Sequence, residues 1–337
     1  MKNFGFSLFI ALLSFSSSVK AVSWHSMGRG LDARYGHTFI YDGNSQTSLL
    51  FGGVGYDESQ LGNLWEWNGS SWYKKIDCGS SVCPSRRALH AMTFCRQGES
   101  GVSVLFGGYT WGLDYNSTWI LNSAGWYELA AQLESPQRRF GHAMAFDEVT
   151  GKLVLFGGEG DKGLLPETRE FDVNTGLWTK YEVPGPMPRK FHSMVFDPNR
   201  QKVMLFGGED AAHNLFSDVW AWEGQLKTWS RFREKEPSPS SRSGQSAVYY
   251  WNSGLGRLFH DGIFLFGGLV DFGNAYQSGE SWFWVEQKKR WLAKRPDFDP
   301  QARELFGLSY DESRNTIVLY GGLTRVAGEM SDLWEFR

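Results

Sequence analysis

The stretch RFGHAMAFDEVTGKLVLFGGEG, residues 139–160, recurs in recognisable form as RKFHSMVFDPNRQKVMLFGGED at residues 189–210. Both copies begin with Arg-x-x-His, continue through two apolar runs separated by a polar turn, and end in a glycine pair followed by an acidic residue. Self-similarity at a period of about 50 residues is a signature of repeat architectures. The pattern predicts a chain built from repeated β units.

Six such units follow one another along the chain, and their glycine pairs lie 50 to 60 residues apart. The pairs end at Gly53, Gly108, Gly158, Gly208, Gly268 and Gly322. Units begin near residues 34, 87, 139, 189, 242 and 303. After each pair come a variable segment and an aromatic run such as NLWEW (63–67), followed in five units by a tryptophan beyond a turn. The pattern of each unit therefore predicts four short strands. The glycine pair ends the second strand, at a place where a Cβ is not tolerated.

The two ends of the repeat array complete each other. The sixth unit stops at DLWEFR (332–337) without a fourth strand, whereas Trp24 in VSWHSMG precedes the first unit. An N-terminal strand that completes the last unit would close the array into a ring and hide two sheet edges. Six four-stranded blades around a central channel form a β-propeller. We predict an all-β, six-bladed propeller closed by its N-terminal strand.

The repeated Arg-x-x-His, the LFGG sequence, the aromatic third strand and the fourth-strand tryptophan resemble the kelch repeat. The resemblance covers nearly all of residues 22–337, which we expect to form one propeller. It implies a six-bladed kelch propeller in which the segment entering each first strand lies beside the central channel. Fold alone does not choose a function for such a scaffold.

The recurring histidine has two interpretations. His37, His90, His142 and His192 would serve as ligands or bases around a common axis, or each would pack inside its own blade. Gln245 and Phe306 replace the histidine in the last two units, which excludes a six-fold histidine ring. A residue repeated once per unit usually serves the unit itself. We expect a structural role.

An arginine opens every unit, including the two that lack the histidine. By the resemblance these arginines lie near the channel mouth, where guanidinium groups would hold carboxylates, sulfates or sugar acids. Alternatively, each pairs with acidic residues or carbonyls of a neighbouring blade. The candidate ligand-binding arginines are Arg34, Arg87, Arg139, Arg189, Arg242 and Arg303.

The variable segments after the glycine pairs are the expected site of specificity, because binding residues concentrate on loops held by a rigid scaffold. Aromatic candidates there are Tyr56, Tyr109, Trp111 and Tyr276. Such side chains stack on sugar rings or anchor a peptide, and they also suit loops that only pack on one another.

These residues indicate a binding protein that recognises a protein or carbohydrate partner through the channel mouth and loops. The alternative is a carbohydrate-active enzyme on a sugar acid, similar to the kelch protein N-acetylneuraminate epimerase. A copper oxidase of the galactose oxidase type is not supported, since its cross-linking cysteine has no suitable counterpart. We expect no cofactor and no metal site: the acidic residues after the glycine pairs lack EF-hand spacing, and the three cysteines lack zinc spacing.

The N-terminus resembles a secretory signal: Lys2, an apolar stretch and small residues before Val22 predict cleavage after Ala21. We therefore expect a secreted or periplasmic monomer, with residues 1–21 removed. Export makes a disulfide between Cys78 and Cys83 plausible and leaves Cys95 as a lone thiol. No later segment has the roughly 20 apolar residues of a membrane-spanning helix. The net charge of −3 does not indicate a nucleic-acid-binding protein.

Overall fold

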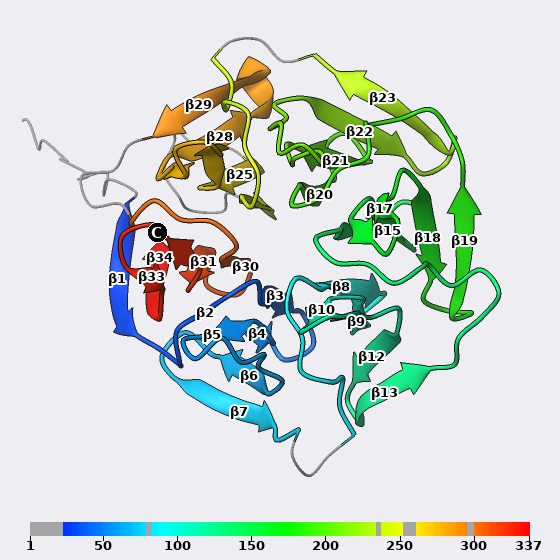
Figure 1. Cartoon of the computed structure of the whole chain (residues 1–337), viewed down its shortest axis with the longest axis horizontal. Helices are drawn as coiled ribbons and strands as arrows, with labels where there is room; N and C mark the ends of the chain where they lie inside the picture. The colour runs from blue at the N-terminus through cyan, green and yellow to red at the C-terminus, as the bar shows by residue number, and fades with distance from the viewer. Residues whose placement is uncertain (1–22, 79–81, 234–236, 252–260, 295–299) are drawn as a thin grey trace, which may run out of the picture.

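The computed structural model describes residues 23–78, 82–233, 237–251, 261–294 and 300–337, so the predicted signal segment lies outside the described residues. Six four-stranded antiparallel sheets surround a central axis (Figure 1). The prediction of an all-β, six-bladed propeller is confirmed. No described segment forms a helix long and apolar enough to cross a membrane.

The blades follow one another in chain order, and each runs from its innermost to its outermost strand. Blade 1 comprises β3 (Thr38–Asp42), β4 (Thr47–Phe51), β6 (Leu64–Trp67) and β7 (Trp72–Ile76), and blade 2 comprises β8 (Ala91–Gln97), β9 (Ser100–Phe106), β12 (Thr118–Asn122) and β13 (Gly125–Leu129). Blade 3 comprises β14 (Ala143–Asp147), β15 (Lys152–Phe156), β18 (Thr168–Asp172) and β19 (Leu177–Tyr181), and blade 4 comprises β20 (Ser193–Asp197), β21 (Lys202–Phe206), β22 (Val219–Glu223) and β23 (Thr228–Phe232). Blade 5 comprises β24 (Ser246–Tyr250), β25 (Gly262–Phe266), β28 (Ser281–Val285) and β29 (Arg290–Lys294), and blade 6 comprises β30 (Gly307–Asp311), β31 (Thr316–Tyr320), β34 (Asp332–Phe336) and β1 (Trp24–Arg29).

An aspartate ends the first strand of four blades and shapes the hairpin to the second strand. The Oδ1 atom of Asp42, for example, accepts hydrogen bonds from the backbone N–H groups of Asn44 and Ser45. Asp147, Asp197 and Asp311 make equivalent bonds. Such aspartate turns hold the chain in a tight reversal. In blade 2 the position belongs to Cys95, a buried free thiol whose pKa is raised by burial.

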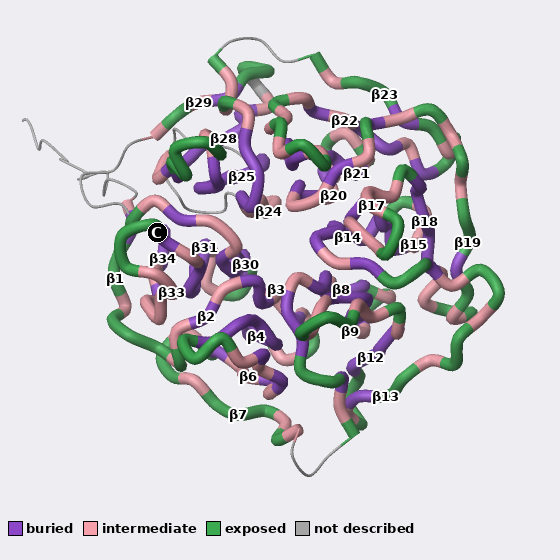
Figure 2. The backbone as a smooth tube through the Cα atoms, in the orientation of Figure 1, coloured by how far each residue is buried: buried purple, intermediate pink, exposed green. Residues whose placement is uncertain are grey.

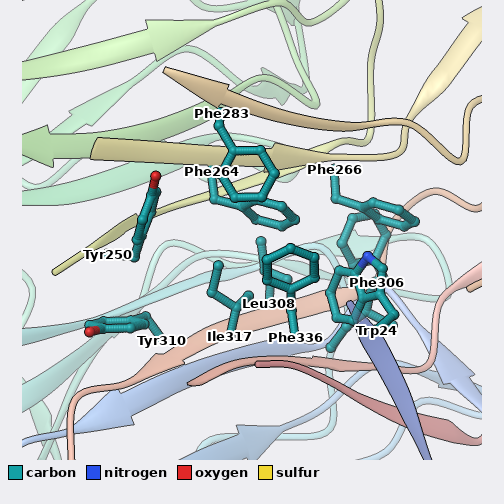
Figure 3. Close-up of a cluster of buried hydrophobic side chains, with 11 residues drawn as sticks. Trp24, Tyr250, Phe264, Phe266, Phe283, Phe306, Leu308, Tyr310, Ile317 and Phe336 are labelled. Carbon is teal, nitrogen blue, oxygen red and sulfur yellow. The ribbon is translucent and has the colours of Figure 1, made fainter. Parts of the chain in front are cut away.

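The predicted closure is confirmed by the pairing of β1 with β34. Trp24 lies opposite Phe336, and Arg29 lies opposite Asp332. The Trp24 indole packs against Phe264 and Phe266 of blade 5 (Figure 3). Its Nε1–H donates a hydrogen bond to Ser281 Oγ at 3.2 Å. Strand β1 thus completes blade 6 and also joins it to blade 5.

The core lies between adjacent blades, where the same aromatic contact recurs six times. In each case the fourth-strand tryptophan packs on the aromatic residue that precedes the glycine pair of the preceding blade, with ring centroids 5.1–5.7 Å apart. The pairs are Trp24–Phe266, Trp72–Tyr320, Trp126–Phe51, Trp178–Phe106, Trp229–Phe156 and Trp291–Phe206. Burial accordingly concentrates on the inner strands, while the outer strands β7, β13, β19 and β23 carry many exposed residues (Figure 2).

Replacing Trp24 by alanine tests how much the closure stabilises the propeller. We expect a loss of about 3–5 kcal/mol of unfolding free energy, since the indole is buried against three rings and its cavity cannot collapse. Tyr127→Ala on the outer strand β13 is the matched control, because its ring is 43% exposed, and should change stability by no more than about 0.5 kcal/mol. Urea unfolding followed by tryptophan fluorescence measures both. Equal losses would show that β1 does not close the ring.

A disulfide joins Cys78 to Cys83 just after β7, as predicted. It links the end of blade 1 to the segment that leads into the first strand of blade 2, and residues 79–81 within it lie outside the described residues.

Candidate functional site

The six repeated arginines lie inside the junctions between blades. Each guanidinium donates from Nη1 to the carbonyl of the first glycine in its own blade's pair, at 2.8–3.3 Å. Each arginine carbonyl accepts from the second glycine N–H of the preceding blade at 2.8–2.9 Å. The arginine thereby ties two glycine pairs together, and all six side chains are buried.

Carboxylates balance the arginine charge in four blades. Glu167, Asp218, Glu280 and Asp332 pair with the arginines of blades 3 to 6. Burial opposes ionisation of Asp218, but hydrogen bonds and charge from Arg189 lower its pKa overall. In blade 2 the equivalent residue is Ser117, which accepts from Arg87 while Tyr115 covers the guanidinium at 4.0 Å. Burial lowers the pKa of Arg87 to about 10, so it stays charged at neutral pH.

This geometry favours the structural alternative for the arginines. Neither of the two cavities along the central axis is lined by any of the six. Their donors are engaged by glycine carbonyls and, in blades 2 to 6, by carboxylate or hydroxyl groups of the same blade. Direct contact between these arginines and a ligand stays a prediction.

The histidines form part of an inner ring that packs between blades. His37, His90, His142 and His192 share this ring with Gln245 and Phe306. A Cβ at Gly107 would lie 2.7 Å from His142 Cε1, and Gly52 stands in the same relation to His90. The expected structural role thus holds, but packing within the histidine's own blade is wrong: the ring lies on the glycine pair of the preceding blade.

Burial keeps these imidazoles neutral. It lowers the pKa of His37 and of His192 to about 3, with smaller contributions from Arg34 and Arg189 respectively. The pKa values of His90 and His142 are also well below the ordinary value, for the same reason. The inner ring is therefore uncharged at neutral pH.

A circular chain of backbone hydrogen bonds runs through the residues that directly precede the inner-ring residues, and the sequence analysis missed it. Each member N–H donates to the carbonyl of the member in the preceding blade at 2.7–2.9 Å. All members have φ between +53° and +67°. They are Gly36, Leu89, Gly141, Phe191, Gly244 and Leu305. The available signal was the alternation of glycine with leucine or phenylalanine two residues after each arginine.

The loops after the glycine pairs form what we call the loop crown, around the end of the axis where the first strands begin. Its short hairpins are β10 (Tyr109–Thr110) with β11 (Leu113–Asp114), β16 (Glu159–Gly160) with β17 (Gly163–Leu164), β26 (Leu269–Asp271) with β27 (Tyr276–Gln277), and β32 (Leu323–Thr324) with β33 (Gly328–Glu329) (Figure 1). In blade 1 the loop strand β5 (Val54–Gly55) pairs instead with β2 (Arg34–Tyr35), in the segment that enters the first strand. In blade 4 the corresponding loop is a turn closed by a bridge between Glu209 and Leu215.

Three of the predicted aromatic candidates are exposed on the loop crown. Tyr56 is 83% exposed, Trp111 63% and Tyr276 62%. Tyr109 is half-buried and packs against Phe140 at 5.8 Å. These side chains come from blades 1, 2 and 5, so they lie around the rim instead of meeting in one pocket. Their binding role stays a prediction.

The loop crown also contains a polar cluster that the sequence analysis did not single out as a unit. Glu209 is buried, accepts from Ser243 Oγ at 2.8 Å and pairs with His213 Nδ1 at 2.9 Å. The His213 ring stacks on Phe272 with centroids 4.0 Å apart. Burial, and secondarily the charge of Glu209, raise the pKa of Glu304 nearby. No group of three or more histidine, cysteine, aspartate or glutamate side chains among the described residues is arranged to hold a metal ion.

Two of the cavities formed by the described residues lie along the axis. The smaller, about 120 Å³, is lined by the circular backbone chain and the inner ring. The larger, about 400 Å³, extends from the inner ring along all six first strands to their far ends. We call the larger cavity the channel.

A ring of six four-stranded blades with glycine pairs at every junction defines a β-propeller of the kelch type. The family model for the kelch-repeat domain of KLHDC2, KLHL20 and DRC7 matches residues 104–256. Together with the six-bladed structure, this match identifies the chain as a kelch-repeat propeller protein.

The chain is also similar to the curated protein called multiple epidermal growth factor-like domains protein 8. The human protein is 30% identical over 164 residues and the mouse protein 30% identical over 167. Each match covers 46% of this chain but only 6% of the relative. The similarity therefore concerns a small part of a much longer protein.

Proposed function

We propose that this kelch propeller is an exported binding module that holds a protein partner on its loop crown. The kelch propeller fold suggests a protein-interaction scaffold. The observation that carries the proposal is the exposure of large aromatic side chains on the loop crown, Tyr56, Trp111 and Tyr276 among them. Aromatic residues of this kind anchor protein interfaces because they bury much area at low entropic cost. Export rests on the N-terminal pattern, which intact mass of the mature chain checks.

Site-specific cross-linking tests the loop crown as the interaction surface. A photoreactive amino acid at position 111 should give discrete protein adducts in the compartment where the chain resides. The same group at position 127, on the outer strand β13, should give none, although Tyr127 is also exposed. Once a partner is identified from the adduct, Trp111→Ala should weaken its binding about 30-fold or more, the effect of a hot-spot residue of about 2 kcal/mol. Adducts at both positions, or at neither, would refute the proposal.

A second candidate is a carbohydrate-active enzyme on a sugar acid. The polar cluster supports it, because Glu209 holds His213 by Nδ1 and leaves its other ring nitrogen for a proton transfer. This candidate also needs a group that binds the carboxylate of the sugar acid, and the repeated arginines are already engaged inside the blades. Turnover of N-acetylneuraminate by the purified chain, abolished by His213→Ala, would establish it in place of the binding module.

A further inference from the structure

The loop crown carries far more acidic than basic side chains. Its six loops are residues 54–62, 109–117, 159–167, 209–217, 269–280 and 323–331. Apart from Glu167 and Glu280, which pair with repeated arginines, they contain nine acidic residues. These nine are Asp57, Glu58, Asp114, Glu159, Asp161, Glu209, Asp210, Asp271 and Glu329. The only basic residues in the loops are Lys162 and Arg325, so nine acids against two bases give a local net charge of −7.

Basic residues next to the loops compensate three of these carboxylates. Lys190 Nζ lies 2.6 Å from Glu159 Oε2 and 3.9 Å from Glu209 Oε1. Arg138 Nε lies 3.6 Å from Asp161 Oδ2. The other six carboxylates make no ion pair with a described residue. The crown therefore presents carboxylates whose charge no neighbouring side chain neutralises.

The negative charge of the molecule is concentrated on this face. Counting also Arg86, Arg138 and Lys190, which adjoin the loops, the crown keeps a net charge of −4. Residues 22–337 together carry −5, because the whole chain carries −3 and both Lys2 and Lys20 precede residue 22. The rest of the molecule is therefore close to neutral, and the crown is the face that attracts cations.

Carboxylates of neighbouring blades are close enough to affect one another. Burial raises the pKa of Asp114 in blade 2, and the charges of Asp161 and Glu159 in blade 3 raise it further, against the opposing effect of Arg138. Like charges gathered in this way repel one another, and a cation placed between them relieves the repulsion.

The exposed aromatic side chains of the crown lie beside these carboxylates. In blade 1, Tyr56 directly precedes residues 57–58, which are both acidic. In blade 2, Trp111 and Asp114 belong to one hairpin, and in blade 5 Asp271 precedes two exposed aromatic residues. An aromatic face next to a carboxylate suits a guanidinium or ammonium group, which gains a cation–π contact and an ion pair.

We propose that the loop crown binds a cationic segment of its protein partner, rich in arginine or lysine. The inference rests on the proposed function, since it names the partner chemistry of the same surface. Unneutralised carboxylates attract such a segment, and the exposed rings hold its charged groups. A second copy of this chain does not suit the surface, because it would bring the same charge. Nucleic acid and anionic lipid are repelled for the same reason.

Fluorescence anisotropy with labelled peptides tests the inference on the mature protein. The probe is a peptide of four Gly-Ser-Arg repeats, and its matches replace every arginine by glutamine or by glutamate. We expect the arginine peptide to bind with a Kd below about 1 mM at about 50 mM salt, at least tenfold more tightly than either match. Raising the salt to about 300 mM should weaken its binding about tenfold, because exposed charges are screened.

A pair of double variants locates the binding. Asp57→Asn with Glu58→Gln removes two exposed charges beside Tyr56 and should weaken arginine-peptide binding threefold or more. Glu99→Gln with Glu128→Gln removes the same charge from the far-end hairpin of blade 2 and from its outer strand, where both residues are exposed, and should leave binding unchanged.

Three results would overturn the inference: no binding of the arginine peptide, equal binding of its glutamine match, or the same affinity in both double variants. Cross-linking at position 111 reports separately on the proposed function. Adducts there together with any of these results would leave the crown as a protein-binding surface without a preference for cations. Selective binding of the arginine peptide without adducts would support cation recognition and refute the binding module.

Discussion

Gly157→Ala is expected to destabilise the propeller by about 4 kcal/mol or more, which places it among the severe substitutions. Gly157 has φ +67°, where an alanine is strained by about 1–2 kcal/mol. In addition, its Cβ would lie 2.5 Å from the Arg189 carbonyl and 3.0 Å from His192 Cε1. The backbone of blade 4 would have to move, and the bond from Gly158 N–H to that carbonyl would weaken.

Gly151→Ala is the matched control for this substitution. Gly151 has φ +65° and nothing within 4 Å of its would-be Cβ, so it isolates the conformational strain from the steric clash. We expect it to lose only about 1–2 kcal/mol. Urea unfolding of both variants gives the difference, and the yield of folded protein sets a lower bound if Gly157→Ala does not fold. Similar losses would contradict the view that the glycine pair is required by the neighbouring blade.

Acidification between pH 7 and pH 5 is expected to destabilise the protein through its inner-ring histidines. The pKa of His192 is about 3 when folded, against about 6.5 for an unperturbed imidazole. Between these values the unfolded chain binds a proton that the folded chain does not. Stability is therefore fully present above pH 6.5 and falls as the pH drops towards 3. Each such histidine removes about 2 kcal/mol by pH 5.

Exchanging histidine and glutamine within the inner ring tests this pH dependence. His192→Gln copies blade 5, where Gln245 donates to the Phe206 carbonyl at 2.8 Å. The variant should lose about 2 kcal/mol less than the parent between pH 7 and pH 5, as measured by urea unfolding at several pH values. Gln245→His should steepen the loss by a similar amount. Parallel curves for all three proteins would show that these imidazoles do not titrate on unfolding.

The number of blades, the order of their strands and the closure by Trp24 were predictable from local pattern. Apolar alternation, tight turns and the glycine pairs repeat in register, and one missing strand at the C-terminus matched one additional strand at the N-terminus. The disulfide between Cys78 and Cys83 was also predictable, because both residues lie in one short segment. These features depend on contacts near in sequence or on counting repeats.

The roles of the repeated polar residues were not predictable in the same way. The arginines alone did not show whether they face the channel or the glycine carbonyls, because the partners lie 18 or more residues away and on a neighbouring blade. Leu89, Phe191 and Leu305 taken singly do not indicate a left-handed backbone, since such strain persists only when surrounding structure enforces it. Only the glycines at the same place in the other three units indicated it. The candidate aromatic residues of the loop crown stay predictions until a partner is found.

Local patterning thus specified the blades, since strand period, turn residues and glycine positions are written along the chain. Only the ring of six blades determined which side chains face one another across the junctions. Whether an inner-ring histidine meets a hydroxyl, as His90 meets that of Thr38, depends on the blade before it, and a single blade does not contain that information. A group's hydrogen bonding, charge and burial are properties of its surroundings, and here those surroundings come from the neighbouring repeat.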